Sequence, residues 1–352
     1  MNQNNGPATP PSFQGSVSGG IEALATIAKV RFDRLFTEPD AIVTAWTQGL
    51  PIAREWFDPD ISFGGPRWAA ISYGHINCLG SRLVFPEDSE VAHTPMFDNL
   101  ADGIRALRRE VDFTKAGRFP FYLELWEQLK RTFPDQTIPF SGFGVEGPVT
   151  TAWLLRGHDF FMDIYDDPPQ AKTFLSLVTA SIVKYKQLLA RINGEPEFNP
   201  SGTYVADDGA AMIPPTLWPD FVLPFMETYF TALTSGTRGI HVEDLSPDHL
   251  PHLETLRINQ YDPSVSKRLS PFVILAHCRI PFTWRFNEIE SATYSTEATR
   301  QWVFDAAAQG APAVRAGIWR NNCTPRGRAN IKAFREAVQT VQHQREAGQR
   351  KE

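Results

Sequence analysis

Short apolar runs alternate with longer helical patterns over most of this chain, and this alternation restricts its fold more than any other feature. Each run is followed by a segment whose apolar residues recur at helical spacing. Strands that alternate with helices indicate βαβ units and a parallel sheet. Six such units, with room upstream for two more, predict an α/β fold, namely a single (β/α)8 TIM barrel with an N-terminal extension. An open doubly wound sheet is the alternative. The runs lie at 137–145, 203–206, 239–241, 259–261, 272–276 and 313–318.

Three parts are expected along the 352 residues. Residues 1–20 are polar and rich in Pro, Gly and Ser, which is typical of a disordered or loosely ordered arm. Residues 21–343 are expected to form the barrel. Residues 344–352 are dense in charged and polar side chains, and we expect them to be a charged C-terminal tail.

Composition narrows the class of protein. The formal net charge is −6 and no basic patch dominates, which argues against a nucleic-acid partner. No run of about 18 apolar residues occurs, so we expect no membrane-spanning helix. The three widely spaced cysteines are not a disulfide framework and favour a reducing, cytoplasmic setting. We therefore expect a cytoplasmic enzyme that acts on a small molecule.

Ionisable or soft side chains stand at the ends of the predicted strands. In (β/α)8 barrels the carboxyl ends of the strands carry the chemistry. The regular placement of these residues therefore predicts one active site at that rim. They are Glu146, Asp207, Asp208, His241, Glu243, Asp262, Cys278 and Cys323.

Four of these residues suggest a metal site. His241 and Glu243 are two residues apart in a predicted strand, so their side chains point to the same side. Cys278 and Cys323 are expected at the ends of two further strands. One imidazole, one carboxylate and two thiolates suit zinc better than a hard cation such as Mg²⁺. We predict a catalytic zinc site from these four residues. The alternatives are a His–Glu ion pair and two buried cysteines.

The remaining carboxylates are candidates for proton transfer. Asp207 and Asp208 follow an apolar strand, where paired carboxylates can hold a proton or a cationic nitrogen. A helix N-cap with a surface charge is the alternative. Glu146 begins a turn that opens a helix, and a plain connection between strand and helix is the alternative there. The predicted catalytic residues are Asp207, Asp208 and Glu146, and the predicted substrate-binding residues are Tyr204, Asp262 and Arg285.

The run 142–147 reads Gly-Phe-Gly-Val-Glu-Gly and matches the dinucleotide-binding pattern GxGxxG. It follows an apolar run and precedes a helix, as that pattern requires. No second mononucleotide-binding half is visible, however, and a strand end loosened by glycines is the preferred interpretation.

Four segments, in this order, resemble the uroporphyrinogen decarboxylase superfamily over roughly residues 40–343. GPVTTAWLLRGHDFFMDIYDDPPQAKTFLSLVTASIVKY resembles the central block of that superfamily. DDGAAMIPPTLWPDFVLPFMETYF resembles its strand-end aspartates and the helix after them. GIHVEDL lies where relatives have His-x-Cys-Gly, and NNCTPRGRANIKAFREAV resembles the closing block.

The resemblance implies a methyltransferase of the zinc-dependent branch, which moves methyl groups between corrinoid proteins and a thiol such as coenzyme M. His241 and Cys323 match the metal ligands of that branch, Glu243 replaces its first cysteine, and Cys278 is expected to supply a second thiolate. Zinc would hold the acceptor thiol as a thiolate that attacks a methyl donor at the barrel mouth. A corrinoid on a partner protein is the expected second cofactor, and a homodimer is left open.

Two other functions remain as alternatives. The second branch of the superfamily consists of metal-free decarboxylases of tetrapyrroles, which carry an N-terminal arginine-rich motif that is not found here. A decarboxylase of a polycarboxylated, tetrapyrrole-like substrate would need arginines gathered at the pocket mouth. The third reading is a module that binds a corrinoid or a small molecule without catalysis.

Overall fold

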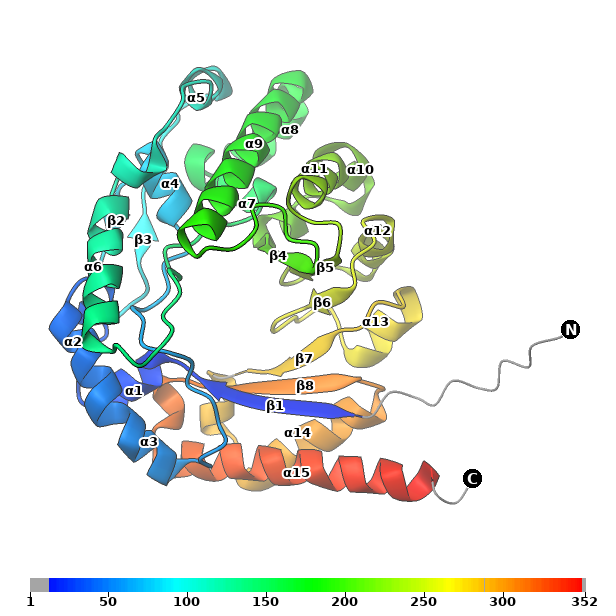
Figure 1. Ribbon diagram of the computed structural model, residues 1–352. Helices are drawn as coiled ribbons and strands as arrows, with labels where there is room; N and C mark the ends of the chain where they lie inside the picture. Colours follow the sequence, from blue (N-terminus) through cyan, green and yellow to red (C-terminus); the bar gives the residue numbers. More distant parts are fainter. Residues whose placement is uncertain (1–12, 288, 350–352) are drawn as a thin grey trace, which may run out of the picture.

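The computed structural model describes residues 13–287 and 289–349 (Figure 1). Its longer strands lie in the middle of the molecule, and helices cover them from outside. The α/β class expected from the alternation of runs and helices is confirmed. The strands are β1 (Gln14–Gly19), β2 (Leu83–Val84), β3 (Ala92–His93), β4 (Gly202–Ala206), β5 (Thr237–His241), β6 (Gln260–Asp262), β7 (Thr283–Phe286) and β8 (Ala313–Ile318).

Helices connect the strands, and polar side chains cap several of them. Asp167 accepts a hydrogen bond from the N–H of Gln170 at the start of α9, and Ser295 accepts one from Ala298 at the start of α14. The α-helices are α1 (Ile21–Ile27), α2 (Pro39–Thr44), α3 (Leu50–Trp56), α4 (Gly74–Leu79), α5 (Leu100–Leu107), α6 (Phe119–Thr132), α7 (Pro148–Arg156), α8 (Phe160–Asp166), α9 (Pro168–Ile192), α10 (Trp218–Phe221), α11 (Leu223–Leu233), α12 (Leu250–Thr255), α13 (Pro271–His277), α14 (Thr296–Ala308) and α15 (Pro325–Gln349). Short helical turns are η1 (Asp33–Phe36), η2 (Ala45–Gly49), η3 (Phe113–Lys115), η4 (Asp208–Met212), η5 (Pro215–Leu217), η6 (Pro247–His249), η7 (Glu290–Thr293) and η8 (Arg320–Asn322).

Parallel pairing places six strands in two sheets, ordered β1-β8-β7 and β4-β5-β6. In the second sheet Ala206 lies opposite His241, and His241 lies opposite Asp262. Strands β2 and β3 form a separate antiparallel pair. Parallel strands end at the same edge of their sheet, so this register brings the side chains at the ends of β4, β5 and β6 to one rim.

One bridge, between Tyr261 and Phe282, links the two sheets, but the described residues do not form one continuous eight-stranded sheet. The segments 61–71 and 138–147 make isolated bridges and no strand. The first contains Gly64-Gly65-Pro66, and a proline has no N–H for a strand ladder. Gly64 and Gly142 also adopt positive φ angles of 73° and 89°, which interrupt extended backbone. A closed barrel therefore stays a prediction. The parallel bridges are Tyr261–Phe282, Ser18–Ser62 and Ile71–Phe143.

An aromatic core fixes the segment 138–147 against helices α6 and α9. The buried Tyr185 hydroxyl donates to the carbonyl oxygen of Phe143 at 2.8 Å. The rings of Tyr122 and Phe143 stack with their centroids 4.5 Å apart. Buried aromatic pairs contribute about 0.5–1.5 kcal/mol beyond the area they remove from water. This packing holds Glu146 at the rim although its segment is not a regular strand.

The loose arm expected over residues 1–20 is wrong for residues 14–19, because these form β1 and pair with β8 along their whole length. The segment QGSVSG has one large apolar residue, so its composition resembles a disordered chain. Its order comes from backbone hydrogen bonds. Residues 1–12 of the arm and residues 350–352 of the tail lie outside the described residues, and residues 344–349 belong to the end of α15.

The strand expected over 272–276 is also wrong, because Pro271–His277 is helix α13. Ser270 caps this helix by accepting a hydrogen bond from the N–H of Val273. A short apolar run has no periodicity that separates a strand from a buried helix, and here the Ser-Pro start was the stronger signal. The following strand is β7, so Cys278 does not stand at the end of a strand.

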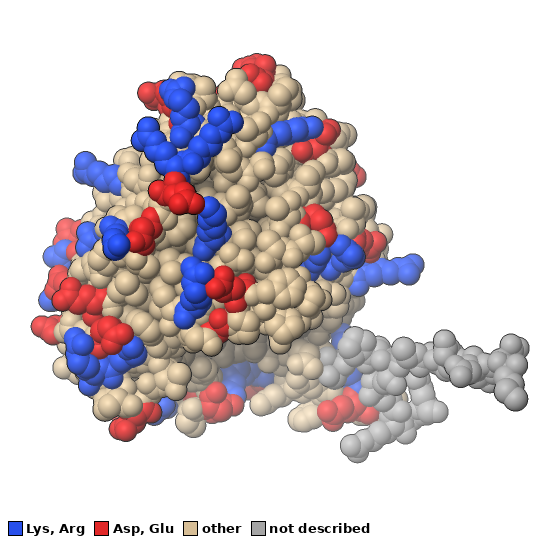
Figure 2. Space-filling model, turned by 45° about the horizontal axis from the view of Figure 1, so that its top comes forward, with Lys and Arg blue, Asp and Glu red and all other residues tan. Residues whose placement is uncertain are grey.

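Charged side chains of both signs are interspersed on the face shown in Figure 2, in keeping with the small net charge of −6. Ion pairs join distant parts of the chain on the surface, such as Arg335 with Asp60 at 2.9 Å and Lys172 with Asp220 at 2.6 Å. Within the described ranges, no helix combines the length and the apolar character that crossing a membrane requires.

Candidate active site

Three neighbouring strands end at one level and carry the residues of the candidate site. β4 ends at Ala206, β5 at His241 and β6 at Asp262, and these residues are register partners. Asp208 follows β4, and Glu243 follows β5. The register therefore places the imidazole of His241 among carboxylates that come from three different strand ends.

His241 contacts three carboxylates. Its Nδ1 lies 3.0 Å from Oδ2 of Asp262, and its Nε2 lies 3.5 Å from Oδ1 of Asp208 and 3.8 Å from Oε1 of Glu243. In the neutral ring, Nδ1–H donates to Asp262, which leaves Nε2 as the acceptor that faces the other two groups. Asp208 is itself held in place, because its Oδ1 accepts a hydrogen bond from the N–H of Glu243 at 2.8 Å.

These contacts set the charge of His241. Burial is the largest influence and lowers the pKa of His241, because it disfavours the charged ring. The hydrogen bond with Asp262 and the charges of Asp208, Asp262 and Glu243 outweigh burial, so the pKa of His241 is raised above its ordinary value of 6.5. The imidazolium that forms when Nε2 takes up a proton is therefore stabilised by the site.

Two arginines and a serine hold Asp262. Arg315 donates to its Oδ2 at 2.7 Å, and Arg285 lies 3.7 Å from the same oxygen. Ser264 donates its N–H to Oδ1 at 2.9 Å, and the Ser264 hydroxyl accepts a hydrogen bond from Arg285 at 2.9 Å. Burial raises the pKa of Asp262, but the hydrogen bonds from His241 and Arg315 outweigh it and lower the pKa to about 2. Asp262 is thus a permanent negative partner for His241.

Asp207 is fully buried and caps helix α7. Its Oδ1 accepts from the N–H of Thr150 at 2.5 Å, and its Oδ2 accepts from the N–H of Val149 at 3.1 Å. Gly147 makes room for it, because a Cβ at that glycine would lie 2.4 Å from Cβ of Asp207. Burial raises the pKa of Asp207 to about 7 against these hydrogen bonds. Asp207 therefore lies under the site and positions α7, and it does not reach solvent.

Glu146 stands beside this cap at the end of the segment 138–147. Burial is the main cause that raises its pKa to about 7, and the charges of Asp208 and Asp207 add to the effect. A hydrogen bond with Ser72 and the charge of His241 act the other way. A carboxyl group with this pKa can take or release a proton near neutral pH.

Tyr204, predicted to bind substrate, projects from β4 toward the interior. Its hydroxyl interacts with Asp262, and its backbone oxygen accepts a hydrogen bond from Tyr229 at 2.8 Å. The side chain is 45% exposed, so one face of the ring is open. Arg285, the other predicted substrate-binding side chain, lies on β7 and joins the same network through Asp262.

Cys278 does not belong to this rim. It follows helix α13, is buried, and receives a hydrogen bond from the N–H of Ile280. Burial raises the pKa of its thiol, and the nearby charge of Glu254 raises it further. A protonated thiol in this place is a small core side chain.

Cys323 lies after β8, where its Sγ contacts the carbonyl oxygens of Ala23 and Trp319 at 3.6 Å each. Burial raises the pKa of this thiol to about 11, so it stays protonated near neutral pH. Within residues 13–287 and 289–349, no three His, Cys, Asp or Glu side chains are grouped so that they could hold a metal ion. The predicted ligands, as arranged here, do not fit a zinc ion, and zinc stays a prediction.

The predicted site residues leave out several side chains of this network. Arg315 is the charged residue in the middle of an otherwise small and apolar strand, β8, and this contrast was a usable signal. Ser264 has a positive φ of 51°, which a sequence does not reveal, although Asp262-Pro263-Ser264 is a turn pattern. Tyr73 lies close enough to Glu146 for that charge to add to burial in raising the pKa of the phenol.

The arrangement suits proton transfer beside an anion-binding pair. His241 is fixed by Asp262 on one side and can take a proton at Nε2 on the other. Arg285 and Arg315 place two positive charges within 4 Å of one carboxylate oxygen. This combination of an oriented histidine and a buried aspartate is a general acid–base arrangement.

Comparisons with known proteins concern the family and the fold. The profile of the family described as "Uroporphyrinogen decarboxylase (URO-D)" matches residues 73–262, a range that includes Glu146, Asp208, His241 and Asp262. A solved structure described as a "methyltransferase from Methanosarcina mazei" aligns over 95% of this chain and 95% of its own, with a TM-score of 0.63 and 16% identity. At that identity the likeness concerns the fold. No curated protein matches the sequence.

Proposed function

This chain belongs to the uroporphyrinogen decarboxylase family, and from that premise we propose that it is a methyltransferase in which His241 acts as the base for an acceptor thiol. The solved methyltransferase that shares its fold supports this choice of reaction. We also propose that the ring of parallel strands is a closed (β/α)8 barrel, with the reaction at its carboxyl rim.

The observation that carries the proposal is the environment of His241. Its Nδ1 lies 3.0 Å from Asp262, and its Nε2 lies 3.5 Å from Asp208 and 3.8 Å from Glu243. A thiol has an ordinary pKa near 8.5 and is a poor nucleophile until it loses its proton. A histidine whose protonated form is stabilised by carboxylates supplies the base that a thiol needs near neutral pH.

The proposed step balances as follows. Nε2 of His241 takes the proton from the acceptor thiol as the sulfur attacks the methyl carbon. A new S–C bond forms, the bond between the methyl group and its donor breaks, and the electron pair of that bond leaves with the donor. The imidazolium is stabilised by Asp262 and Asp208 until it returns its proton to the leaving group or to solvent.

A methyl corrinoid on a partner protein is the donor that we propose, because the family resemblance includes such reactions. Zinc is assigned no step, because within the described residues Cys278 and Cys323 are not grouped with His241 in a set that could hold a metal ion. In the proposed reaction, the His241–Asp262 pair therefore activates the acceptor thiol.

A methyl-transfer assay tests this proposal. Methylcobalamin and 2-mercaptoethanol serve as probes, and loss of the methylcobalamin absorbance is followed with formation of the methyl thioether. We expect turnover by the protein and a fall of about 10²–10⁴-fold in kcat/KM for His241→Gln, which removes the base. Lys184→Gln, on the exposed side of α9, is the control and should behave like the unchanged protein. Turnover that His241→Gln leaves intact would contradict the assignment.

Decarboxylation is a second candidate, because Arg285 and Arg315 converge on Asp262 as an anion-binding pair. In that reaction the C–CO₂⁻ bond breaks, carbon dioxide leaves, and the carbon receives a proton from His241 or Glu146. Release of carbon dioxide from uroporphyrinogen, without methyl transfer, would favour this function. Loss of that release in Arg285→Gln would assign the arginine to substrate binding.

A further inference from the structure

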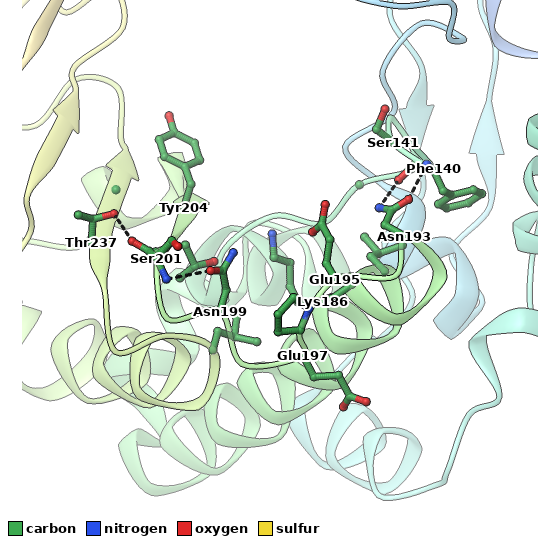
Figure 3. A pocket seen from close by; sticks show the side chains of 18 of the residues that line it. Phe140, Ser141, Lys186, Asn193, Glu195, Glu197, Asn199, Ser201, Tyr204 and Thr237 are labelled. Atoms are coloured by element: carbon green, nitrogen blue, oxygen red, sulfur yellow. Dashed lines mark hydrogen bonds between the residues drawn. The ribbon is translucent and has the colours of Figure 1, made fainter. Parts of the chain in front are cut away.

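A cavity lies at the opposite ends of the strands from His241. It has a volume of about 680 Å³ and opens beside the C-terminal part of α9, the loop 193–201 and the first residues of β4 and β5 (Figure 3). Ligand pockets of small molecules commonly measure about 300–1,000 Å³. Tyr204 is the predicted site residue that also lines this cavity.

Lys186 points from α9 into this cavity, as Figure 3 shows. Among the described residues it has no hydrogen-bond or ion-pair partner within the usual distances, although it is half-buried. Burial lowers the pKa of Lys186, and the charge of Glu195 raises it by less. A half-buried lysine with no ion-pair partner is more often a nucleophilic amine near neutral pH than an exposed lysine is.

The other lining groups are mostly neutral. Glu197 is already paired with Arg191 at 2.9 Å, whereas Glu195 faces the same space as Lys186 and has an exposed carboxylate. Asn193 binds the backbone of Phe140 through both atoms of its amide, so it shapes the wall and is not free to bind a ligand. The cavity thus offers one amine and one carboxylate to a ligand.

We propose that this cavity is a second small-molecule site, in which Lys186 captures an aldehyde or a ketone as an imine. A neutral carbonyl compound fits the observations better than an anion, because the exposed carboxylate of Glu195 lies on the cavity wall and repels negative charge. The half-exposed ring of Tyr204 offers an apolar face to the body of such a ligand. This inference does not depend on the proposed methyl transfer.

The imine step balances in atoms and electrons. The nitrogen of the neutral amine attacks the carbonyl carbon, and the oxygen takes up a proton to give a carbinolamine. The nitrogen gives up one of its protons in this step. The C–O bond then breaks, the oxygen leaves as water with a second proton, and the lone pair of the nitrogen forms the C=N bond as the nitrogen releases its other proton. Glu195 is the group on the cavity wall that can move these protons.

Reductive trapping tests the site. The full-length protein is incubated with pyridoxal and borohydride at pH 7 and at pH 10.5, and modified lysines are counted by mass spectrometry. Lys184, two residues away on the exposed side of α9, is the internal control. We expect Lys186 to be modified faster than Lys184 at pH 7, by about tenfold for each unit by which its pKa lies lower. The ratio should fall toward one at pH 10.5.

Two variants complete the test. Lys186→Met should remove the modification from its peptide and leave Lys184 unchanged. Glu195→Gln should quicken the trapping at Lys186 at pH 7, because the negative charge that raises the pKa of this lysine is lost. Equal or slower modification of Lys186 at pH 7 in the unchanged protein overturns the proposal, and this comparison needs no variant to fold. Methyl transfer that persists in Lys186→Met separates this site from the one at His241.

Discussion

At the scale of single residues, the neighbours of His241 give it the proposed role of a base, and its being a histidine is not enough. The same imidazole in an apolar place would stay neutral, as His75 does, where burial lowers the pKa to about 3. Around His241 three carboxylates reverse that effect. The difference between the two histidines is one of charged neighbours, since both are shielded from solvent.

The cysteines supply a prediction at this scale. Cys278→Ala and Cys323→Ala should each leave kcat/KM of methyl transfer within about twofold, because protonated thiols away from His241 take no part in the step. Steady-state assays measure this, and zinc analysis of each purified protein accompanies them. If the unchanged protein contains bound zinc, and Cys323→Ala loses both the zinc and the activity, the metal mechanism is favoured instead.

Much of the candidate site could be predicted from the sequence. Asp208, His241, Glu243 and Asp262 follow apolar runs, and runs that are parallel strands must bring their ends together. Asp207 had the cap interpretation as an alternative, and the structure selects it. Cys278 could not be placed from the sequence, because the apolar run before it, 272–276, is compatible with a strand and with a helix.

At the scale of elements, α7 depends on a carboxylate from the next strand. Asp207 follows β4 and binds the first N–H groups of α7, so strand and helix hold each other. The same contact keeps Glu146, which precedes α7, close to His241. Helix capping from a distant segment is invisible to a local sequence pattern, which explains why Asp207 also resembled a catalytic residue.

The cap gives a prediction for stability. Asp207→Asn should lower the free energy of unfolding by about 1–3 kcal/mol, because one of two buried N–H groups loses its acceptor. Burial raises the pKa of Asp207 from 3.8 to about 7, so the folded state holds the proton more tightly than the unfolded state. The stability that this tighter proton binding contributes is complete below pH 3.8 and is lost as the pH rises to about 7.

Urea unfolding of both proteins at several pH values measures this effect. The difference between them should change between about pH 4 and 7 and become constant above. Thr151→Ser, on the same helix, is a mild control. Equal stability of Asp207→Asn and the unchanged protein at every pH would remove Asp207 from its role as a cap.

At the scale of the whole molecule, strand β1 and helix α15 bring the two ends of the described chain together. β1 pairs with β8, and Gly15 of β1 contacts Val338 of α15. The alternation of strands and helices was predictable because it follows from local patterns. The place of β1 was not, because its partners lie about 300 residues away and its own sequence is polar.

This contact predicts a coupling between the two ends. A Cβ at Gly15 would lie 2.3 Å from a methyl group of Val338, so Gly15→Ala should lower the free energy of unfolding by about 1–3 kcal/mol through overpacking. Val338→Ala opens space, and the double variant should recover part of the loss. Thermal and urea unfolding of the four proteins give the coupling energy. Strict additivity would mean that the two residues do not touch.

The central claim is that carboxylates around His241 make it the base of the site, and a pH titration of its ring by NMR tests this directly. The His241 signal is assigned by its absence in His241→Gln. We expect its midpoint above 6.5, and a lower midpoint in Asp208→Asn, because that variant removes a negative charge 3.5 Å from Nε2. A midpoint at or below 6.5 that Asp208→Asn leaves unchanged would contradict the account.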